Sequence, residues 1–333
     1  MDYTAVGFKA GLEIHQQLKT HKLFCECPSE ISEKIDYSFQ RMLRPTQSEL
    51  GDVDRAALDE AQRKRRFTYM ASLASTCLVE TDEEPPHAAN PEAIDLCLTM
   101  ALLLDASPVD EVQFMRKIVV DGSNTTGFQR TALVAMNGCI GNVRITMITL
   151  EEDAARKLAE EKNLVKYGLD RLWIPLIEIT TAADITSPQH AREVAVQLGV
   201  LLQATKKVKR GLGTIRQDLN ISIAKGARVE VKGIQSLSST AKVAVIEKRY
   251  LATHPTEGLE DALKGCGIQA THQEKIVRII RTIVSERKEF IRTQGNRSLG
   301  PLMGVVMKEL RGKADGKLII TLLEQEIQKV LSN

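Results

Sequence analysis

The segment Gly11-Leu12-Glu13-Ile14-His15-Gln16-Gln17-Leu18 alternates apolar and polar side chains from Leu12 to His15 and predicts a short β-strand. Residues two apart on a strand point to the same face. Leu12 and Ile14 would therefore face a core, and Glu13 and His15 would lie side by side on the other face. A carboxylate beside an imidazole can hold a divalent cation or share a proton. This segment alone leaves open an ordinary half-buried strand with a surface Glu and His.

The composition is that of a soluble globular protein, with 333 residues, 43% hydrophobic and 26% charged, and predicts roughly two domains. No run of about 18 apolar residues occurs, and residues 1–4 lack a signal-peptide pattern. We therefore expect a cytoplasmic protein without a membrane span. The six cysteines are scattered, which predicts free thiols. Cys25-Glu26-Cys27 resembles half of a zinc site, but no second close pair of Cys or His follows it.

Basic residues are concentrated in two parts of the chain, although the formal net charge is only +2. Residues 203–232 contain eight basic and two acidic side chains. The last sixty residues contain twelve basic and seven acidic side chains. A local excess of this kind is typical of a surface that binds a polyanion, and each patch alone is also compatible with a solvated face.

Periodicity and turn residues predict both strands and helices, and hence an α+β fold. The expected strands lie at residues 6–18, 23–25, 32–39, 112–121, 143–150, 173–179, 214–223 and 229–233. Helices are expected at 54–77, 91–104 and 187–202, with N-caps at Asp54 and Asn90, and a further helix is expected to begin at Glu151. The pattern is almost entirely helical from residue 261 on. We place the domain boundaries at 1–237, with a junction at 238–260 and a helical domain at 261–333.

Four of the expected strands carry polar groups on one face. Glu178 stands alone in the apolar segment 173–179, and a buried carboxylate is costly unless it is paired or bound to a cation. A sheet that presents acids beside basic residues is suited to a metal and nucleotide site, because carboxylates hold Mg²⁺ while Arg and Lys neutralise phosphate. The polar groups are Glu13 and His15, Glu178, Arg216 with Asp218 and Asn220, and Glu230 with Lys232.

The loop Gly122-Ser123-Asn124-Thr125-Thr126-Gly127 is small, rich in hydroxyl groups and bounded by glycines. Glycine permits a close approach of the backbone to a ligand, and Ser, Thr and Asn offer short hydrogen-bond donors. The loop could hold phosphates, although it lacks the lysine of a P-loop. Many loops of this composition have no such role.

Several segments together resemble the GatB/GatE family, most closely its archaeal branch of glutamyl-tRNA(Gln) amidotransferase subunits. The resemblance covers about residues 5–235 and 258–330. The matching segments are Gly11–His15, Cys77–His87, Asp121–Thr131, Leu150–Ala154, Pro175–Ile179, Gly213–Asn220, Val229–Gly233, Ser298–Lys308 and Gly312–Asp315.

The resemblance implies an enzyme that uses ATP and Mg²⁺ to phosphorylate the γ-carboxylate of glutamate misacylated on tRNA(Gln). Ammonia then displaces phosphate and gives Gln-tRNA(Gln). The family also implies a GatD-like asparaginase subunit that supplies the ammonia, and a homodimer within a heterotetramer. The implied fold is a cradle-like domain with a mostly antiparallel sheet, of the glutamine synthetase and guanidino kinase type, followed by a helical tRNA-binding tail.

The resemblance also implies roles for residues at the matching positions. Glu13, His15, Arg216 and Asp218 are implied to act in catalysis, with Arg216 offsetting phosphate charge. The implied metal ligands are His15, Glu178 and either Glu151 or Glu152. The implied nucleotide or substrate contacts are Ser123, Asn124, Thr125 and Lys232, and the implied tRNA contacts are Lys308, Arg311 and Lys313.

One departure from the family is visible in the sequence. The archaeal members carry an insertion related to a domain of aspartyl-tRNA synthetases, whereas this chain passes from Gln235 to the tail within residues 236–260. The chain also lacks an evident nucleophile for releasing ammonia from an amide. Two alternatives remain at this point: a non-catalytic tRNA-binding relative, and a Mg²⁺-dependent phosphotransferase acting on another carboxylate.

Overall fold

The structure is a computed structural model, and it divides the chain into two compact units, Met1–Lys248 and Arg249–Asn333. It describes residues 3–32, 34–48, 50–161, 163–211, 213–224, 226, 228–234, 280, 282–310 and 316–331. The predicted junction at 238–260 lies outside these residues. Within them, no helix has the length and apolar character that crossing a membrane requires.

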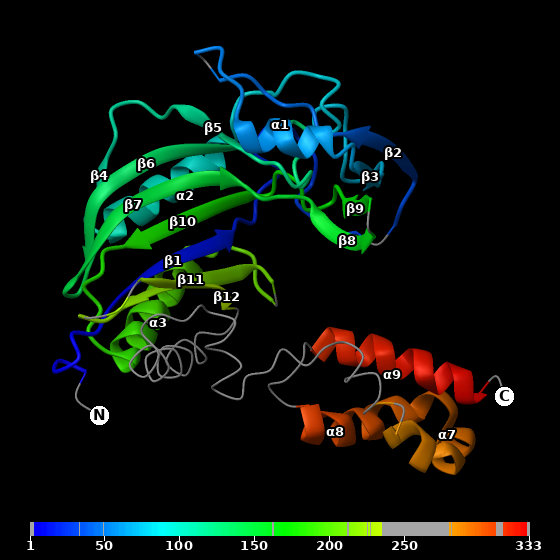
Figure 1. The fold of residues 1–333 in the computed structure, drawn as a ribbon. Coiled ribbons are helices and arrows are strands. Elements are labelled where there is room, and N and C mark those ends of the chain that lie inside the picture. Colours follow the sequence, from blue (N-terminus) through cyan, green and yellow to red (C-terminus); the bar gives the residue numbers. More distant parts are fainter. Residues whose placement is uncertain are drawn as a thin grey trace. The chain divides into compact units, whose positions relative to one another are not determined.

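An eight-stranded sheet forms the centre of the first unit (Figure 1). Its strands are β1 (Lys9–Gln17), β4 (Ser107–Pro108), β5 (Phe114–Ile118), β6 (Phe128–Ile140), β7 (Val143–Glu152), β10 (Pro175–Thr181), β11 (Ile215–Ser222) and β12 (Val229–Ile234). The order is β12-β11-β1-β10-β7-β6-β4, and β5 also pairs with β6. All the pairings are antiparallel. The expected α+β class with a mostly antiparallel sheet is therefore confirmed.

Helices α2 (Pro91–Leu103) and α3 (Pro188–Ala204) cover one face of this sheet (Figure 1). The sheet turns its apolar residues toward them, because strand neighbours such as Leu12 and Leu219, or Ile14 and Ile179, share a face. These four side chains are completely buried. Burial of each contributes about 1.5–3 kcal/mol. The alternation of β1 thereby leaves its polar residues on the face opposite the helices.

A smaller sheet of four strands completes the first unit, in the order β2 (Tyr37–Met42), β3 (Arg66–Ala71), β9 (Leu164–Gly168) and β8 (Arg156–Glu161). Strands β3 and β9 run parallel, and the other pairs are antiparallel. Aromatic rings pack across the sheet, with Tyr69 stacked on Tyr167 at 6.2 Å between ring centroids. This sheet supports the glycine-bounded loop, because the hydroxyls of Tyr69 and Tyr167 donate to the backbone carbonyls of Gly122 and Asp121.

Three helix starts follow from local sequence. Asp54 accepts a hydrogen bond from the Ala57 N–H at the start of α1 (Arg55–Gln62), as predicted. Asn90 accepts from Glu92 and Ala93 at the start of α2, also as predicted. Ser187 caps α3.

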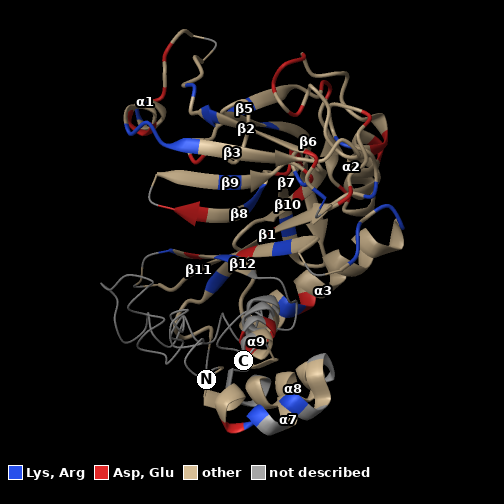
Figure 2. Cartoon of the chain, turned by 90° about the vertical axis from the view of Figure 1, so that its right-hand side faces the viewer, with Lys and Arg blue, Asp and Glu red and all other residues tan. Residues whose placement is uncertain are grey.

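Three secondary-structure predictions were wrong. The helix expected over 54–77 ends at Gln62, because Lys64 adopts a positive φ and the following residues alternate as strand β3, with Phe67 and Tyr69 buried. The basic residues 63–66 therefore form the turn before strand β3 and its first residue (Figure 2). No helix begins at Glu151, because the pairing of β7 with β10 continues through Glu152. The segment 23–25 forms a turn and not a strand.

The second unit is helical in the part that the structure describes. Its elements are α7 (Lys288–Gln294), the 3₁₀ turn η1 (Gly295–Ser298), α8 (Leu299–Leu310) and α9 (Gly316–Leu331). A small apolar core joins them, formed by Ile280, Ile283, Val284, Ile291, Leu302, Val306, Leu323 and Ile327.

Gly122 is required at its position in the loop by both conformation and space. Its φ is +79°, and a Cβ built there would lie 2.3 Å from the buried ring of Phe67. We expect Gly122→Ala to lower the free energy of unfolding by about 2–4 kcal/mol, since strain and overpacking add. Gly141→Ala is the matched control, because Gly141 has a φ of +57° and open space around it. Equal losses in urea unfolding would show that the Phe67 contact contributes nothing.

Candidate active site on the open face of the large sheet

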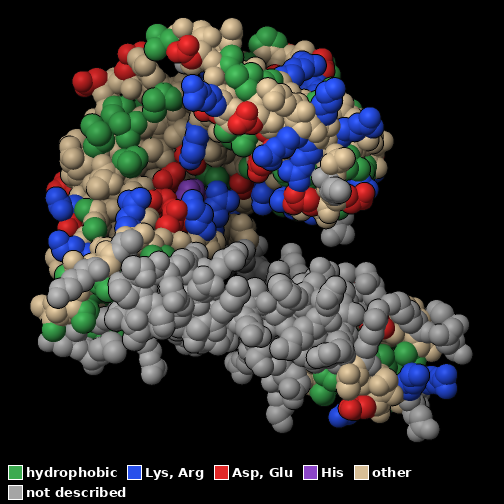
Figure 3. Space-filling view, viewed as in Figure 1, with side chains coloured by type: hydrophobic (Ala, Val, Ile, Leu, Met, Phe, Trp, Pro, Cys, Tyr) green, Lys and Arg blue, Asp and Glu red, His purple; other side chains and the backbone are tan. Residues whose placement is uncertain are grey.

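The pairing of three strands brings the polar residues together. His15 on β1 lies opposite Glu178 on β10 and opposite Arg216 on β11. Glu13 lies opposite Asp218. Opposite residues in an antiparallel pair point to the same face, so all five lie on the face away from α2 and α3. Figure 3 shows acidic and basic side chains gathered around a histidine in a hollow of this face.

His15, Glu151 and Glu178 form the more buried of two groups in the hollow. Their potential ligand atoms all lie within 4.8 Å of one another. His15 Nε2 is 3.5 Å from Glu178 Oε2, and the buried His15 Nδ1 has no hydrogen-bond partner among the described residues. Thr131 donates to Glu151, and Thr180 donates to Glu178. These hydroxyls orient the two carboxylates.

The pKa values of the two carboxyls move in opposite directions. Burial and the negative charge of Glu178 raise the pKa of Glu151. Burial also acts to raise that of Glu178, but the hydrogen bond and charge of His15 outweigh it and lower the pKa to about 2. The pKa values of the two acids are thus separated, the usual result when two acids share a site. A divalent cation would offset the repulsion between the two carboxylates, so the three residues fit a metal ion that accepts oxygen and imidazole ligands.

A second acidic group lies next to the first and consists of Glu13, Asp218 and Glu230, also within 4.8 Å. Burial and the charges of Glu178, Glu230 and Asp218 raise the pKa of Glu13. Asn220 donates to Glu13 at 3.2 Å, and Lys232 Nζ lies 3.3 Å from Glu230. The predicted residues Asp218 and Lys232 therefore belong to this second group.

Arg216 connects the acidic groups to a residue that the sequence reasoning did not single out. Its Nη1 lies 3.7 Å from Oδ1 of Asp153, which is buried. Gln17 donates to the other oxygen of Asp153 at 2.8 Å, and Arg171 lies 3.8 Å away. The only sequence signal for Asp153 was its place at the end of an acidic run. Its contacts hold Arg216 at the border of the hollow, where a guanidinium can offset phosphate charge.

Strand alternation separates Glu151 from Glu152, which the sequence left as alternatives. Glu152 is completely buried, and Arg130 donates to it from the backbone N–H at 2.8 Å and from the guanidinium at 3.0 Å. Burial raises the pKa of Glu152 to about 7. The structure groups Glu151, and not Glu152, with His15 and Glu178.

The predicted loop residues make hydrogen bonds within the protein. Thr125 donates its hydroxyl to the backbone oxygen of Glu80 at 2.7 Å, and the Ser123 carbonyl accepts from Ala155. Asn124 is buried, and its amide has no hydrogen-bond partner among the described residues. Lys308 belongs to α8, whereas Arg311 and Lys313 lie outside the described residues.

A group of thiols lies elsewhere in the first unit. The sequence showed no second pair beside Cys25-Glu26-Cys27, but the fold places Cys77 and Glu80 there, with the four ligand atoms within 4.8 Å. A hydrogen bond from Cys25 lowers the pKa of Cys27. Three sulfurs and a carboxylate oxygen are a donor set that suits zinc. Glu80 also pairs with Lys22, whose Nζ is 2.8 Å from its Oε1.

Acidic groups on a sheet with an arginine at their border are chemically suited to a cation and a phosphorylated ligand. Residues 8–307 match the family described as the GatB/GatE catalytic domain. The chain is 48% identical to the E-type subunit of the glutamyl-tRNA(Gln) amidotransferase of Aeropyrum pernix over 318 residues, which are 94% of this chain and 49% of the relative. It is 54% identical to the corresponding protein of Methanococcus maripaludis over 248 residues, which are 73% of this chain and 39% of the relative.

The chain therefore belongs to the GatB/GatE catalytic domain family. It spans about half, or less, of the length of these curated relatives. The family recognised from the sequence segments is thus confirmed.

Proposed function

We propose that this chain is the ATP-dependent catalytic part of an enzyme that converts glutamate attached to tRNA(Gln) into glutamine. The observation that carries the proposal is the grouping of His15, Glu151 and Glu178 beside Arg216, in a chain about half identical to amidotransferase subunits. A free carboxylate is a poor acyl donor because its leaving group would be oxide. Phosphorylation supplies a leaving group, and a site built for a cation and phosphate suits that step.

The proposed reaction has two steps. An oxygen of the glutamyl γ-carboxylate attacks the γ-phosphorus of ATP, and ADP leaves. Ammonia then attacks the acyl carbon, phosphate leaves, and the nitrogen loses a proton to give the amide. His15, Glu151 and Glu178 would hold Mg²⁺, which neutralises charge on the phosphates. Arg216 would offset charge on the transferred phosphoryl group.

The remaining acids and cations shape the same hollow. We call His15, Glu151 and Glu178 the metal group. Glu13 and Asp218 lie beside it, and Lys232 pairs with Glu230 at its edge. We assign Ser123, Asn124 and Thr125 to the border of the nucleotide or acyl end, with Asn124 as the residue whose buried amide lacks a partner within the described part. A partner subunit of the asparaginase type, GatD-like, would supply ammonia, and Lys308, Arg311 and Lys313 would contact tRNA. The assembly proposed is a homodimer within a heterotetramer.

The test measures ATP hydrolysis by the purified chain with Mg²⁺ and Glu-tRNA(Gln), using ammonium chloride at mildly alkaline pH as the nitrogen source. We expect ADP release to depend on the glutamyl-tRNA, and the tRNA-bound amino acid to become glutamine. Uncharged tRNA and Gln-tRNA(Gln) are controls that lack the reacting carboxylate. Hydrolysis stimulated by free carboxylates without tRNA would show a small-molecule phosphotransferase, and tRNA binding without turnover would show a non-catalytic relative. Either result overturns the proposal.

A further inference from the structure

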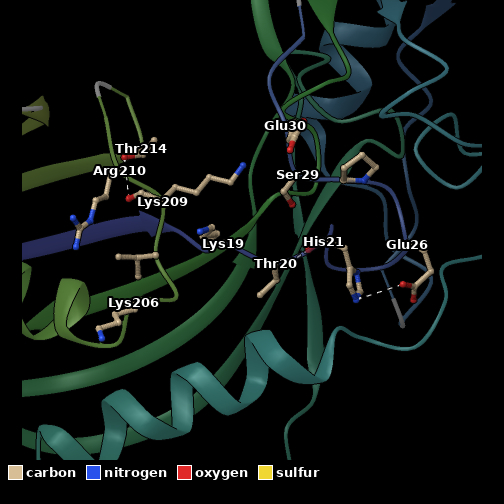
Figure 4. A pocket seen from close by; sticks show the side chains of 12 residues that line it. Lys19, Thr20, His21, Glu26, Ser29, Glu30, Lys206, Lys209, Arg210 and Thr214 are labelled. Carbon is tan, nitrogen blue, oxygen red and sulfur yellow. Dashed lines mark hydrogen bonds and ion pairs between the residues drawn. The ribbon is translucent and has the colours of Figure 1, made fainter.

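A cavity of about 840 Å³ opens beside the end of β1, outside the acidic groups. One wall is the chain that follows β1, and the other is the segment that follows α3. Figure 4 shows Lys209 extending from the second wall toward the part of the first that carries Ser29 and Glu30. The lining residues are Lys19, Thr20, His21, Glu26, Pro28, Ser29, Glu30, Lys206, Val208, Lys209, Arg210 and Thr214.

Four cations line this cavity, and none of them has a salt bridge within the described part of the chain: Lys19, Lys206, Lys209 and Arg210. Of the two acids at the lining, Glu26 is directed to His21 at 3.6 Å, and Glu30 is exposed. The hydroxyls of Thr20 and Thr214 donate to backbone carbonyls, whereas the buried Ser29 hydroxyl has no hydrogen-bond partner among the described residues. Cations without a salt bridge, beside one hydroxyl without a partner, in a concave surface are suited to phosphate oxygens.

The two walls are held together by backbone hydrogen bonds and connect directly to the hollow. The Lys19 N–H donates to the Lys207 carbonyl at 2.7 Å, and the Lys209 N–H donates to the Gln17 carbonyl at 2.9 Å. From His15 to Lys19 the chain advances four residues, which in extended conformation span about 13 Å. Lys19, on the wall of the cavity, therefore lies at most about 13 Å from His15 along the chain.

This separation decides between two phosphate ligands. In ATP the reacting γ-phosphate is bonded to the β-phosphate, which is bonded in turn to the α-phosphate, so all three must lie near the acidic groups if the γ-phosphate does. In an aminoacylated RNA, a ribose and the glutamyl chain separate the terminal phosphate from the reacting carboxylate. We infer that the cavity binds backbone phosphates of the single-stranded 3′ end of the RNA while its acylated terminus reaches His15, Glu151 and Glu178. This inference rests on the proposed function for the identity of the reacting group.

The test is RNA binding by the whole chain carrying Lys19→Glu and Arg210→Glu, both exposed positions. The probes are an uncharged RNA hairpin with a four-nucleotide single-stranded 3′ tail and the same hairpin with a blunt end, measured by fluorescence anisotropy. We expect at least about tenfold weaker binding of the tailed hairpin. The slope of log K against log salt should fall by about 1.4, or about 0.7 for each lost phosphate contact to a single strand. Binding of the blunt hairpin should not change.

The matched control is Lys9→Glu with Arg192→Glu, which makes the same charge change at the opposite ends of β1 and α3. Equal loss of RNA binding in the control would overturn the inference, because the overall electrostatic attraction between the protein and RNA would then explain the loss. Loss of ATP binding with unchanged RNA binding would assign the cavity to the nucleotide and also overturn it. If the variant with Lys19→Glu and Arg210→Glu unfolds, Lys19→Ala with Arg210→Ala replaces it and should also bind the tailed hairpin more weakly. The hairpin measurement requires no turnover, so a failed amidation assay with a positive tail effect refutes only the proposed reaction.

Discussion

Replacing Lys22 with methionine is expected to lower the free energy of unfolding by about 3–5 kcal/mol, the usual cost of removing one partner of a buried ion pair. The side chains of Lys22 and Glu80 are both completely buried, and their charged atoms are 2.8 Å apart. Lys22 also donates to the carbonyls of Ser75 at 2.7 Å and Leu169 at 3.0 Å. Methionine fills similar space but leaves the Glu80 charge and both carbonyls without this donor.

The loss should depend on pH in a defined direction. Burial acts to raise the pKa of Glu80, but the charge of Lys22 and hydrogen bonds from Cys77 and Lys22 outweigh it, so this pKa lies below its usual value. Stability from Glu80 in the parent protein is therefore present above a pH of about 4.5 and is lost as the pH falls further. Without Lys22, burial dominates and raises the pKa of Glu80, so the variant gains stability as the pH falls. The difference in the free energy of unfolding between the parent protein and Lys22→Met should be larger at pH 8 than at pH 5.

Urea unfolding in the presence of EDTA measures this difference without a contribution from metal at the neighbouring thiols. Lys34→Met is the matched control, because Lys34 is exposed and pairs with Asp36 at 2.9 Å at the surface, where an ion pair contributes little. Lys22→Met combined with Glu80→Gln should lose less than the sum of the two single changes, since neither charge is then left alone. A loss in Lys22→Met no greater than in Lys34→Met would contradict the assigned role of the pair.

Six of the eight strands of the large sheet were predicted, because their signal is local, whereas β4 and the long strand β6 were missed. Leu12 and Ile14 alternate with Glu13 and His15, and burial against α2 and α3 follows that alternation. The same rule places Glu178 on the polar face, since it lies opposite His15. The periodicity of apolar residues could not predict that the helix ends at Gln62. Pairing of β3 with β9 outweighs the helix propensity of the residues that follow.

Contacts between distant segments were not predictable from one sequence. Glu80 lies 53 residues from Cys27, and no spacing rule joins them. The basic cavity depends on the isolated β-bridge between Leu18 and Val208, which pairs two segments whose sequence patterns do not match each other. The choice between Glu151 and Glu152 needed the continuation of β7, whereas the sequence had suggested a helix start. These misses share a cause: each depends on contacts between segments far apart in the sequence and not on neighbouring residues.

Replacing Glu178 with glutamine is expected to reduce tRNA-dependent ATP hydrolysis about 100- to 1000-fold, equivalent to about 3–4 kcal/mol of lost charge stabilisation. Glutamine keeps the size of the side chain and can still accept a hydrogen bond from Thr180, so the fold should persist. It removes the negative charge that the low pKa of Glu178 maintains beside His15. Without that charge, the group loses its strongest attraction for a divalent cation.

Two further variants decide whether the effect belongs to the metal group. Glu151→Gln should also reduce turnover, because Glu151 lies with His15 and Glu178. Glu152→Gln should instead lower stability, since Glu152 is buried against Arg130. Glu193→Gln is the matched surface control, because Glu193 is exposed on α3 and accepts only from Gln189 in the described part of the chain.

Binding of Mn²⁺, followed by electron paramagnetic resonance, gives a measurement that does not depend on turnover. Glu178→Gln and Glu151→Gln should each weaken Mn²⁺ binding, and raising the Mg²⁺ concentration should restore part of the lost ATP hydrolysis. Glu152→Gln and Glu193→Gln should bind Mn²⁺ as the parent protein does. If Glu178→Gln hydrolysed ATP at the parent rate and at the same Mg²⁺ concentration, the cation would have to be held elsewhere. The neighbouring group of Glu13, Asp218 and Glu230 would then be the next candidate for the cation site, because it is the other acidic group in the same hollow.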